Sequence, residues 1–444
     1  MVLKTLFSFS FLAMLMLPAA AQGTFGGGSG TSANPYIINT AAHFTELSDS
    51  VRASHNYTGK YFIVTADIDF SNQNHTPIGN NFDGSSDIHY FYGHVDGQNH
   101  SIQNFRSEFS ESGVGLFGII GAGAELKNIH IASGTVSGSG LVGSVLGFNY
   151  GGTVTHCSAG NQVTVSTGLY YVGGVVGANG TGGTITGCIN YATVQGTGSN
   201  GMNVGGIAGA SNGTITECCN MGPVSGVRYV GGITSYSDEG TIIRNCYNGG
   251  NISASVEYAG GIAGSLMTVS ACIIENCYNY GNITAPTDAA AICAYSYPQT
   301  TYTNNHFDQQ TSGVSDSHAT GQSTATMTGG SFAATLNSST ATCWNEDAQL
   351  QNNGYPVFGW LAHASIGGSL WIGEKPLIWS NEQSIEIQFA TPGNGSISLF
   401  SPSGQLLGKE TISSLQHSIA AEKGNVYLIC IETENGQYIQ KLVH

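Results

Sequence analysis

The chain has 444 residues, of which 9% are charged and 64 are glycine, and its 11 Lys and Arg against 27 Asp and Glu give a formal net charge of −16. With 10% aromatic residues, it is not a disordered acidic tail. The scarcity of clustered cations excludes nucleic acid as a partner, because a phosphate backbone is bound through such cations.

The first 21 residues have the pattern of a secretory signal peptide. Lys4 precedes an apolar run that ends at Leu17, and the small residues Ala19 and Ala21 follow it. The run is too short to span a bilayer, and the remaining chain has no stretch of about 18 apolar residues. We therefore expect cleavage near Ala21 and a mature chain that is secreted or held at the outer cell surface, without a transmembrane segment.

Residues 22–110 are predicted to form an N-terminal cap and the first, irregular coils of a repeat fold. Behind a Thr40 N-cap, apolar residues recur at helical spacing, namely Phe44, Leu47 and Val51. From 61 to 105 the residues alternate in the strand manner. The helix is expected to cover the open strand edges at this end.

A repeat of about 30 residues runs through residues 111–310. Its clearest phrase, Gly-Thr-Ile-Thr-x-Cys or a variant of it, ends in turn at Cys157, Cys188, Cys218, Cys246 and Cys277. The register extends to Ile129 before these cysteines and to His306 after them, which gives seven copies. Each copy holds three short apolar pieces divided by Gly or Asn turns. This pattern predicts an all-β fold, a parallel β-helix with three strands per coil and coils about 4.8 Å apart.

In such a stack, like residues lie on like residues. The cysteines should form a buried column, and asparagines two residues later should lie at the bend, where they tolerate left-handed conformations and bond to neighbouring backbone: Asn190, Asn220, Asn248 and Asn279. Double glycines such as Gly205-Gly206 are expected where a Cβ would collide.

Ten cysteines in an exported chain suggest disulfides. However, the repeat cysteines recur because their coil position recurs, and Ile129 takes the same place. The slot therefore favours a small buried apolar group and a reduced ladder. Zinc is disfavoured, because no paired two-residue Cys spacing occurs.

The period is lost after residue 310. Residues 311–365, with Trp344, Tyr355, Phe358 and Trp360, are predicted to be the distal cap of the solenoid. Residues 366–444 alternate short strands with Gly and Asn turns, which predicts a small, separate β-sandwich.

The repeats resemble the GLUG motif, in phrases such as Gly113-Val114-Gly115-Leu116-Phe117-Gly118 and Val172-Gly173-Gly174-Val175-Val176-Gly177. The likeness covers roughly residues 30–360. It implies a right-handed β-helix of an adhesin-like protein on a bacterial surface, with no established common catalytic residues. One departure is Ala289-Ala290-Ala291, which replaces the double glycine of the last coil.

Residues 366–444 resemble the C-terminal sorting domain of the type IX secretion system of Bacteroidetes. The matching pieces include Ile397-Ser398-Leu399-Phe400 and Gly424-Asn425-Val426-Tyr427-Leu428-Ile429. The resemblance implies that the type IX machinery carries the protein through the outer membrane. Removal of this domain would then leave the protein released or attached to surface lipopolysaccharide.

Parallel β-helices also include polysaccharide lyases and hydrolases, which need a cation near the sugar or paired carboxylates. Between residues 111 and 298 the cations are Lys127, Arg228 and Arg244. Arg244 and Glu275 occupy matching places in successive coils, which predicts a surface ion pair. We expect no enzyme activity and no catalytic residues, with a polysaccharide-active enzyme as the alternative.

Two further readings concern the outer surface. Acidic residues near the first coils could hold calcium, although turn and cap roles explain them equally well: Asp67, Asp69, Asp83, Asp87 and Asp96. No other cofactor and no other metal site is expected. The Thr-x-Thr steps that end at Thr155, Thr186 and Thr216 would stack into two hydroxyl columns, as in ice-binding solenoids, but strand propensity alone favours threonine.

The remaining hypothesis is that the protein binds a partner, either a glycan or an extracellular protein. Tyrosines distributed over the coils supply the aromatic surface: Tyr170, Tyr171, Tyr191, Tyr229, Tyr247, Tyr258, Tyr278 and Tyr280. Tyr247 and Tyr278 directly follow ladder cysteines and should point outward, because successive side chains of a strand face opposite ways. This pair is the first candidate for ligand contact.

Overall fold

The computed structural model describes residues 25–363, apart from 80–87, 199–200, 338–341 and 348–350. Beyond residue 376 it describes 377–380, 384–389, 395–400, 406–412, 414–420, 426–433 and 436–443. The predicted signal peptide, Asp83 and Asp87 therefore lie outside the described residues. None of the helices in these ranges is long and apolar enough to cross a membrane.

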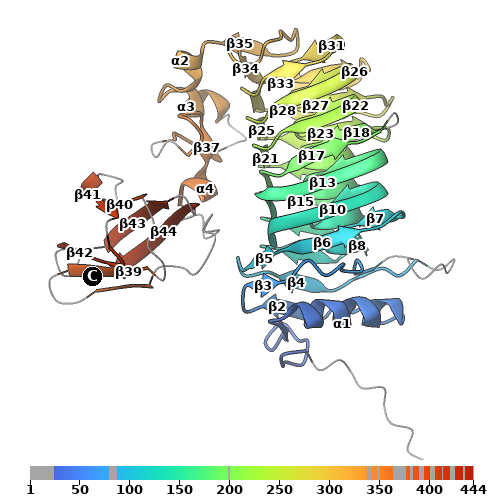
Figure 1. The fold of residues 1–444 in the computed structure, drawn as a ribbon. Coiled ribbons are helices and arrows are strands. Elements are labelled where there is room, and N and C mark those ends of the chain that lie inside the picture. Colours follow the sequence, from blue (N-terminus) through green and yellow to red (C-terminus); the bar gives the residue numbers. More distant parts are fainter. Residues whose placement is uncertain are drawn as a thin grey trace, which may run out of the picture.

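Three parallel sheets wind into a β-solenoid of about nine turns, which confirms the predicted stack of three-stranded coils (Figure 1). The first sheet contains β1 (Tyr36–Ile38), β2 (Tyr61–Val64), β4 (His94–Asp96), β9 (Glu125–Lys127), β12 (Thr153–Thr155), β15 (Thr184–Thr186), β20 (Thr214–Thr216), β24 (Ile242–Arg244), β28 (Cys272–Glu275) and β33 (Thr300–Thr303). The second sheet contains β3 (Ile68–Asp69), β5 (Ser101–Gln103), β6 (Phe105–Glu108), β7 (Ser112–Val114), β10 (His130–Gly143), β13 (Ser158–Gly173), β16 (Ile189–Asn190), β17 (Thr193–Gly196), β18 (Met202–Gly205), β21 (Cys219–Asn220), β22 (Val224–Gly231), β25 (Tyr247–Asn248), β26 (Ile252–Gly260), β29 (Tyr278–Asn279), β30 (Ile283–Thr284), β31 (Thr287–Ala290), β34 (His306–Asp308) and β35 (Thr320–Gln322). The third sheet contains β8 (Phe117–Ile120), β11 (Leu146–Asn149), β14 (Val176–Asn179), β19 (Ala208–Ser211), β23 (Thr234–Ser237), β27 (Ala263–Leu266) and β32 (Cys293–Ser296).

The interior is filled by columns of like residues, one per coil. In the first sheet the middle residue of each short strand points inward and is fully buried: Val154, Ile185, Ile215, Ile243 and Ile274. Branched side chains suit a pleated surface, and burying each one stabilises the fold by about 1.5–3 kcal/mol. The repeated phrase therefore encodes a continuous core.

The coil register continues past the last cysteine through Asn305, one residue earlier than the predicted His306. His306 pairs with Tyr278, which follows Cys277, so Asn305 occupies the cysteine slot. Its Oδ1 accepts the backbone N–H of Cys277 at 3.0 Å, and its Nδ2 donates to the Ile274 carbonyl at 2.8 Å. A side-chain amide thus pairs backbone groups of the preceding coil.

The four repeat asparagines, Asn190, Asn220, Asn248 and Asn279, form a fully buried ladder. Each of the first three donates its Nδ2 to the Oδ1 of the next asparagine, at 2.7, 2.8 and 2.7 Å. Each Nδ2 also donates to the backbone carbonyl two residues later, at 2.9 to 3.1 Å. The predicted bonding across coils is confirmed.

The left-handed backbone predicted for these asparagines lies elsewhere in the coil. One left-handed corner precedes each cysteine, at His156, Gly187, Glu217, Asn245 and Asn276, with φ between 50 and 64°. A second precedes the double glycines, at Leu141, Tyr171, Asn203, Tyr229, Tyr258 and Asp288, with φ between 52 and 64°. The asparagine ladder instead serves hydrogen bonding, and the first corner lies three residues before each ladder asparagine.

The double glycines stand where the neighbouring backbone leaves no room for a side chain. A Cβ on Gly205 would lie 1.9 Å from the Ala208 carbonyl oxygen, and one on Gly206 would lie 2.1 Å from the Gly232 carbonyl oxygen. In the last coil Ala290 pairs with Gly260, in the place of the first glycine. Ala291 takes the place of the second glycine, and no further coil stacks on it among the described residues, so the following-coil carbonyl that leaves no room for a Cβ at Gly206 is missing there.

Both ends of the stack are covered. The helix α1 (Ala41–Arg52) buries the predicted Phe44, Leu47 and Val51, and it begins after Thr40, whose side chain makes no capping hydrogen bond. At the other end, Asp316 Oδ2 accepts the backbone N–H groups of Ile292 and Cys293 at 2.8 and 3.1 Å. A carboxylate there replaces the carbonyl that another coil would supply.

Residues 320–363, named here the flank segment, lie along the side of the solenoid as well as at its end (Figure 1). They contain β35, α2 (Thr324–Met327), α3 (Phe332–Leu336), β36 (Trp344–Asn345), β37 (Val357–Phe358) and α4 (Gly359–His363). The segment was expected to be a distal cap, but its large apolar residues also pack against β25 and β29 on the side of the solenoid.

The C-terminal part forms two small antiparallel sheets. One contains β38 (Leu377–Ser380), β39 (Ser384–Gln388) and β42 (Gln416–Ala420), and the other contains β40 (Gly395–Phe400), β41 (Leu406–Ile412), β43 (Val426–Thr433) and β44 (Gly436–Val443). Residues of both sheets share one core, including Ile387 and Ile431.

The asparagine ladder should be worth more than a surface hydrogen bond. We expect Asn248→Ala to lower the free energy of unfolding by about 1–3 kcal/mol, because one N–H of Asn220 Nδ2 and the Oδ1 of Asn279 would each lose a buried partner. Urea unfolding measures the change. Asn251→Ala, at an exposed site of the same coil, is the control and should have little effect. Equal midpoints for both variants would contradict this account.

Candidate functional site

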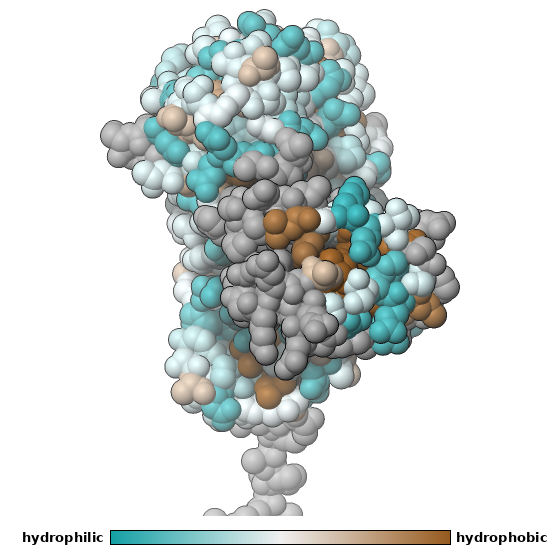
Figure 2. All heavy atoms as spheres, turned by 90° about the vertical axis from the view of Figure 1, so that its left-hand side faces the viewer, coloured by the Kyte–Doolittle hydropathy of each residue, from teal (hydrophilic) through white to brown (hydrophobic). Residues whose placement is uncertain are grey.

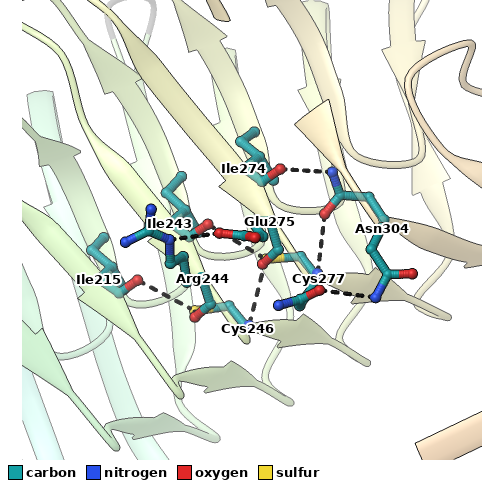
Figure 3. Close-up of polar contacts among 10 residues, drawn as sticks. Ile215, Ile243, Arg244, Cys246, Ile274, Glu275, Cys277 and Asn304 are labelled. Carbon is teal, nitrogen blue, oxygen red and sulfur yellow. Dashed lines mark hydrogen bonds and ion pairs between the residues drawn. The ribbon is translucent and has the colours of Figure 1, made fainter. Parts of the chain in front are cut away.

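The repeat cysteines Cys157, Cys188, Cys218, Cys246 and Cys277 form a fully buried column of free thiols. Figure 3 shows two of them: Cys246 Sγ lies 3.1 Å from the Arg244 carbonyl oxygen, and Cys277 Sγ lies 3.3 Å from that of Glu275. The nine cysteines whose side chains the structure describes are all free. Burial of the column fits the predicted slot for a small apolar group, and the reduced state of the ladder stays a prediction.

Burial governs the chemistry of this column. It raises the pKa of the Cys157, Cys218 and Cys246 thiols well above the ordinary value. Because the thiolate is the reactive and metal-binding form, these side chains are inert at neutral pH. The column is a structural feature and not a reaction centre.

Tyr247 and Tyr278 point away from the interior, but their burial contradicts the predicted exposed binding pair. Their exposed fractions are 2% and 0%. The two rings stack at 5.0 Å, and Trp344 of the flank segment packs on both, at 6.1 and 5.4 Å. Phe358 contacts Tyr247 at 5.4 Å. The outward direction was right, but a distant segment of the chain covers the surface.

Hydrogen bonds fix the flank segment in this position. Asn352 Nδ2 donates to Tyr278 Oη at 2.9 Å, and Tyr278 donates in turn to the Pro356 carbonyl. Tyr355 stacks on Tyr280 at 4.0 Å and donates to Asp308 Oδ2 at 2.6 Å. Figure 2 shows the side of the molecule on which the flank segment and the C-terminal sheets lie, with hydrophobic residues gathered midway along it. The tyrosines here form a second core.

The described aspartates of the first coils bond to turns. Asp67 Oδ1 accepts the Ser101 N–H at 2.9 Å, and Asp69 Oδ1 accepts the Ser71 N–H at 2.6 Å. Asp96 Oδ1 accepts the Gln98 N–H at 2.9 Å. Hydrogen bonds from Asn104 and Ser71 lower the pKa of Asp69. Within the described ranges, no three His, Cys, Asp or Glu side chains gather closely enough to hold a metal ion.

The three cations between residues 111 and 298 are all in ion pairs. The predicted pair of Arg244 and Glu275 is confirmed, with Nε to Oε2 at 2.7 Å (Figure 3). Arg228 pairs with Glu257 of the next coil, and Lys127 Nζ lies 3.7 Å from Asp96 Oδ2. A lyase would need such a cation free to meet a sugar carboxylate.

The cluster of polar side chains most similar to a catalytic site lies at the C-terminal end of the solenoid, around Cys293. His318 Nδ1 lies 3.1 Å from Asp316 Oδ1, and its ring stacks on Tyr302 at 4.3 Å. The Cys293 thiol instead donates to the Tyr295 carbonyl at 3.3 Å. Burial raises the pKa of Cys293 to about 12. The thiol therefore lacks the activation that a nucleophile needs.

The two predicted threonine columns stand in register on the first sheet, over three coils. Thr184 Oγ1 donates to Thr153 Oγ1 at 3.1 Å, and the Thr186 and Thr216 hydroxyls lie 3.1 Å apart. Hydroxyls that bond along the column stabilise neighbouring strands.

A continuous band of tyrosines lies where the second sheet meets the third. This tyrosine strip contains Tyr170, Tyr171, Tyr229, Tyr236, Tyr258, Tyr295 and Tyr297. Tyr229 and Tyr258 of successive coils stack face to face at 5.3 Å and 7°. The other neighbouring rings along the strip have centroids 5.1 to 6.4 Å apart. Tyr170 and Tyr295 are 43% and 38% exposed, and the remaining five are half-buried.

Two columns of the coil supply the strip. Tyr171, Tyr229 and Tyr258 stand at the left-handed corner before the glycines, which turns their side chains out of the second sheet. Tyr236 and Tyr295 stand at one outward column of the third sheet, on β23 and β32. The sequence pattern revealed the first column, whereas Tyr236, Tyr295 and Tyr297 were missed because they fall outside the repeated glycine and cysteine phrases.

A pocket of about 420 Å³ lies at the C-terminal end of the strip. Its lining includes Tyr295, Tyr297, Pro298, Tyr302 and His318. Tyr302 Oη bonds to Ser296 Oγ at 2.7 Å, which fixes one wall. Aromatic walls with a few polar groups are typical of small-ligand sites of this size.

Comparison with known proteins identifies similar sequences over parts of the chain. No protein-family model matches it. A candidate Gly-rich membrane protein of Evansella cellulosilytica is 34% identical over 144 residues, 30% of this chain and 15% of that protein. Halomucin of Haloquadratum walsbyi is 31% identical over 186 residues, 41% of this chain and 2% of that protein. The chain thus spans a small part of the length of both relatives.

Among solved structures, a candidate immunoglobulin A1 protease from Bacteroides ovatus is similar, with a TM-score of 0.49 and 22% identity. The similarity covers 76% of this chain and 95% of that one.

The cysteine column predicts a distinctive thiol reactivity. In the native protein at pH 8, we expect the five column thiols to resist a thiol reagent, because they are fully buried. In denaturant at the same pH, without reductant, they should react fully. Peptide mapping after labelling locates them. Failure to react until reductant is added would mean that the column is disulfide-bonded.

Tyr278 should act on stability and not on binding. We expect Tyr278→Phe to lower the free energy of unfolding by about 1–2 kcal/mol, since Asn352 Nδ2 and the Pro356 carbonyl would lose a buried partner. Thermal unfolding of the purified protein measures this. Tyr170→Phe, which changes an exposed hydroxyl, is the control.

Proposed function

We propose that the protein is a secreted or cell-surface, adhesin-like solenoid that binds a glycan along the tyrosine strip without catalysing a reaction. The observation that carries the proposal is the run of seven tyrosine rings along one corner of the solenoid, each with a neighbouring ring centroid 5.1 to 6.4 Å away. An aromatic band of this kind on an otherwise polar surface is typical of a ligand-binding face. A host or matrix protein is the other class of ligand that such a face could take.

Tyrosine suits this role for physical reasons. The ring offers a large contact area with few rotatable bonds, and its hydroxyl can bond to polar ligand groups. Because the coils hold the rings in register, little conformational freedom is lost on binding. The spacing of 5.3 Å between Tyr229 and Tyr258 allows both rings to contact one extended chain.

The absence of catalysis in this proposal rests on the state of the candidate reactive groups. Arg228, Arg244 and Lys127 are neutralised by carboxylates, and the thiol of Cys293 is buried and protonated. Binding needs none of these groups to be free.

The finer family assignment belongs to the same proposal. We take the coils as right-handed GLUG repeats and residues 366–444 as a β-sandwich sorting domain of the type IX system. The GLUG phrases and the two C-terminal antiparallel sheets with a shared core support this. The predicted signal peptide supports export, after which the protein is released or kept at the surface.

Removing rings from the strip tests the binding proposal. We expect Tyr229→Ala and Tyr258→Ala each to weaken glycan binding about tenfold, because each ring contributes about 1 kcal/mol or more to aromatic contact. A glycan array followed by calorimetry measures the loss.

Tyr61→Ala, on the first sheet where Tyr61 stacks with His94, is the matched control and should leave binding unchanged. Turnover of a polysaccharide by the purified protein would contradict the non-catalytic part of the proposal. An equal loss in all three variants would show that the strip is not the binding face.

A further inference from the structure

We infer that the tyrosine strip takes an uncharged glycan and that Asn203 provides the polar contact that recognises it. This inference rests on the proposed function. It adds the class of ligand and one specificity residue within the strip.

Asn203 stands in the aromatic column itself. Tyr170, Met202 and Arg228 pair in successive coils, so the residues that follow them occupy one corner position. Those residues are Tyr171, Asn203 and Tyr229, with φ of 60, 60 and 56°. The amide therefore lies in the coil between two rings of the strip. In the outward column of the third sheet that contains Tyr236, the coil of Asn203 has the small residue Ala210, which pairs with Tyr236 of the next coil.

The amide of Asn203 has an unmet hydrogen-bonding need. The residue is 9% exposed, and its Oδ1 has no hydrogen-bond partner among the described residues. A buried acceptor without a partner is destabilising. A sugar hydroxyl is a suitable donor, since it would lie beside rings that contact the apolar face of the sugar. Rotation of the amide or of an adjacent ring brings the two together, a side-chain change common on binding.

The charge around the strip selects against acidic glycans. Asp238 lies two residues after Tyr236 of the strip. Burial raises the pKa of Tyr236, and the Asp238 carboxylate raises it further. Asp288 stands in the corner column next after Tyr258. The nearby cation, Arg228, is paired with Glu257. Uronate or sulfate groups would therefore meet like charge without a free cation, whereas hydroxyl groups would not.

The test compares neutral and acidic polymers on the purified full chain and two variants. The neutral probes are a mannan, a β-glucan and dextran, and the acidic probes are polygalacturonate and chondroitin sulfate. Titrations at low ionic strength keep surface charges least screened. We expect binding to at least one neutral polymer and to neither acidic one.

The two variants isolate the amide. Asn203→Gly keeps the left-handed backbone without strain and should weaken binding about tenfold, the equivalent of one good hydrogen bond. Asn245→Gly is the control, because Asn245 has a φ of 52° and an unpaired Oδ1 but lies at the corner between the first and second sheets. It should bind like the parent. Thermal unfolding checks that both variants fold.

Each outcome separates the inference from the proposed function. Acidic polymers that bind as tightly as neutral ones would overturn the charge argument and leave glycan binding in place. A folded Asn203→Gly variant with parental affinity would overturn the role of the amide. Binding to none of the five polymers by the folded protein would overturn the proposed function, and the inference would fall with it.

Discussion

The fold depends on one constraint: every coil must place its backbone hydrogen-bonding groups opposite those of the next, about 4.8 Å away. A residue that fits once must then fit again directly above, so each position of the repeat becomes a column. Inside the solenoid the columns are narrow. In the asparagine ladder from Asn190 to Asn279, the side-chain amides hydrogen-bond to one another from coil to coil. A carbonyl of the following coil leaves no room for a Cβ at Gly206. Sequence identity at these positions is a consequence of stacking.

Stacking also creates two ends and long sides that the repeat cannot satisfy. The helix α1 covers one end. At the other end the Asp316 carboxylate accepts the two backbone N–H groups that a further coil would pair. The flank segment covers the side over β25 and β29, where its Trp344 and Phe358 bury Tyr247 and Tyr278. An aromatic column of the solenoid can therefore be in one of two environments. Covered by a later segment, it is a second core; left uncovered, as in the tyrosine strip, it is a surface that can meet a ligand.

The sequence predicted what periodicity determines. The three-stranded coil, the buried cysteine column, the cross-coil asparagine bonds and the pair of Arg244 and Glu275 all follow from residues about 30 apart being neighbours. Burial of Tyr278 did not follow, because the covering residues lie after the repeat and carry no period. The left-handed corner before each cysteine was also missed, since His156, Gly187, Glu217 and Asn245 share a backbone conformation and not a residue type.

Under the proposed function, ligand specificity must come from positions outside the interior columns. Interior columns are nearly uniform because a coil that departed from them would lose buried hydrogen bonds or collide with its neighbour. The outer corner is free of that constraint, and there the residues change from coil to coil: Leu141, Tyr171, Asn203, Tyr229, Tyr258 and Asp288. Backbone geometry at this corner is constant, with φ between 52 and 64°, so each side chain leaves the rod in an equivalent way. The solenoid therefore holds these side chains at a regular spacing, and stacking does not explain the order of rings, amide and carboxylate along it. Under the proposed function, this order would determine which ligand is bound.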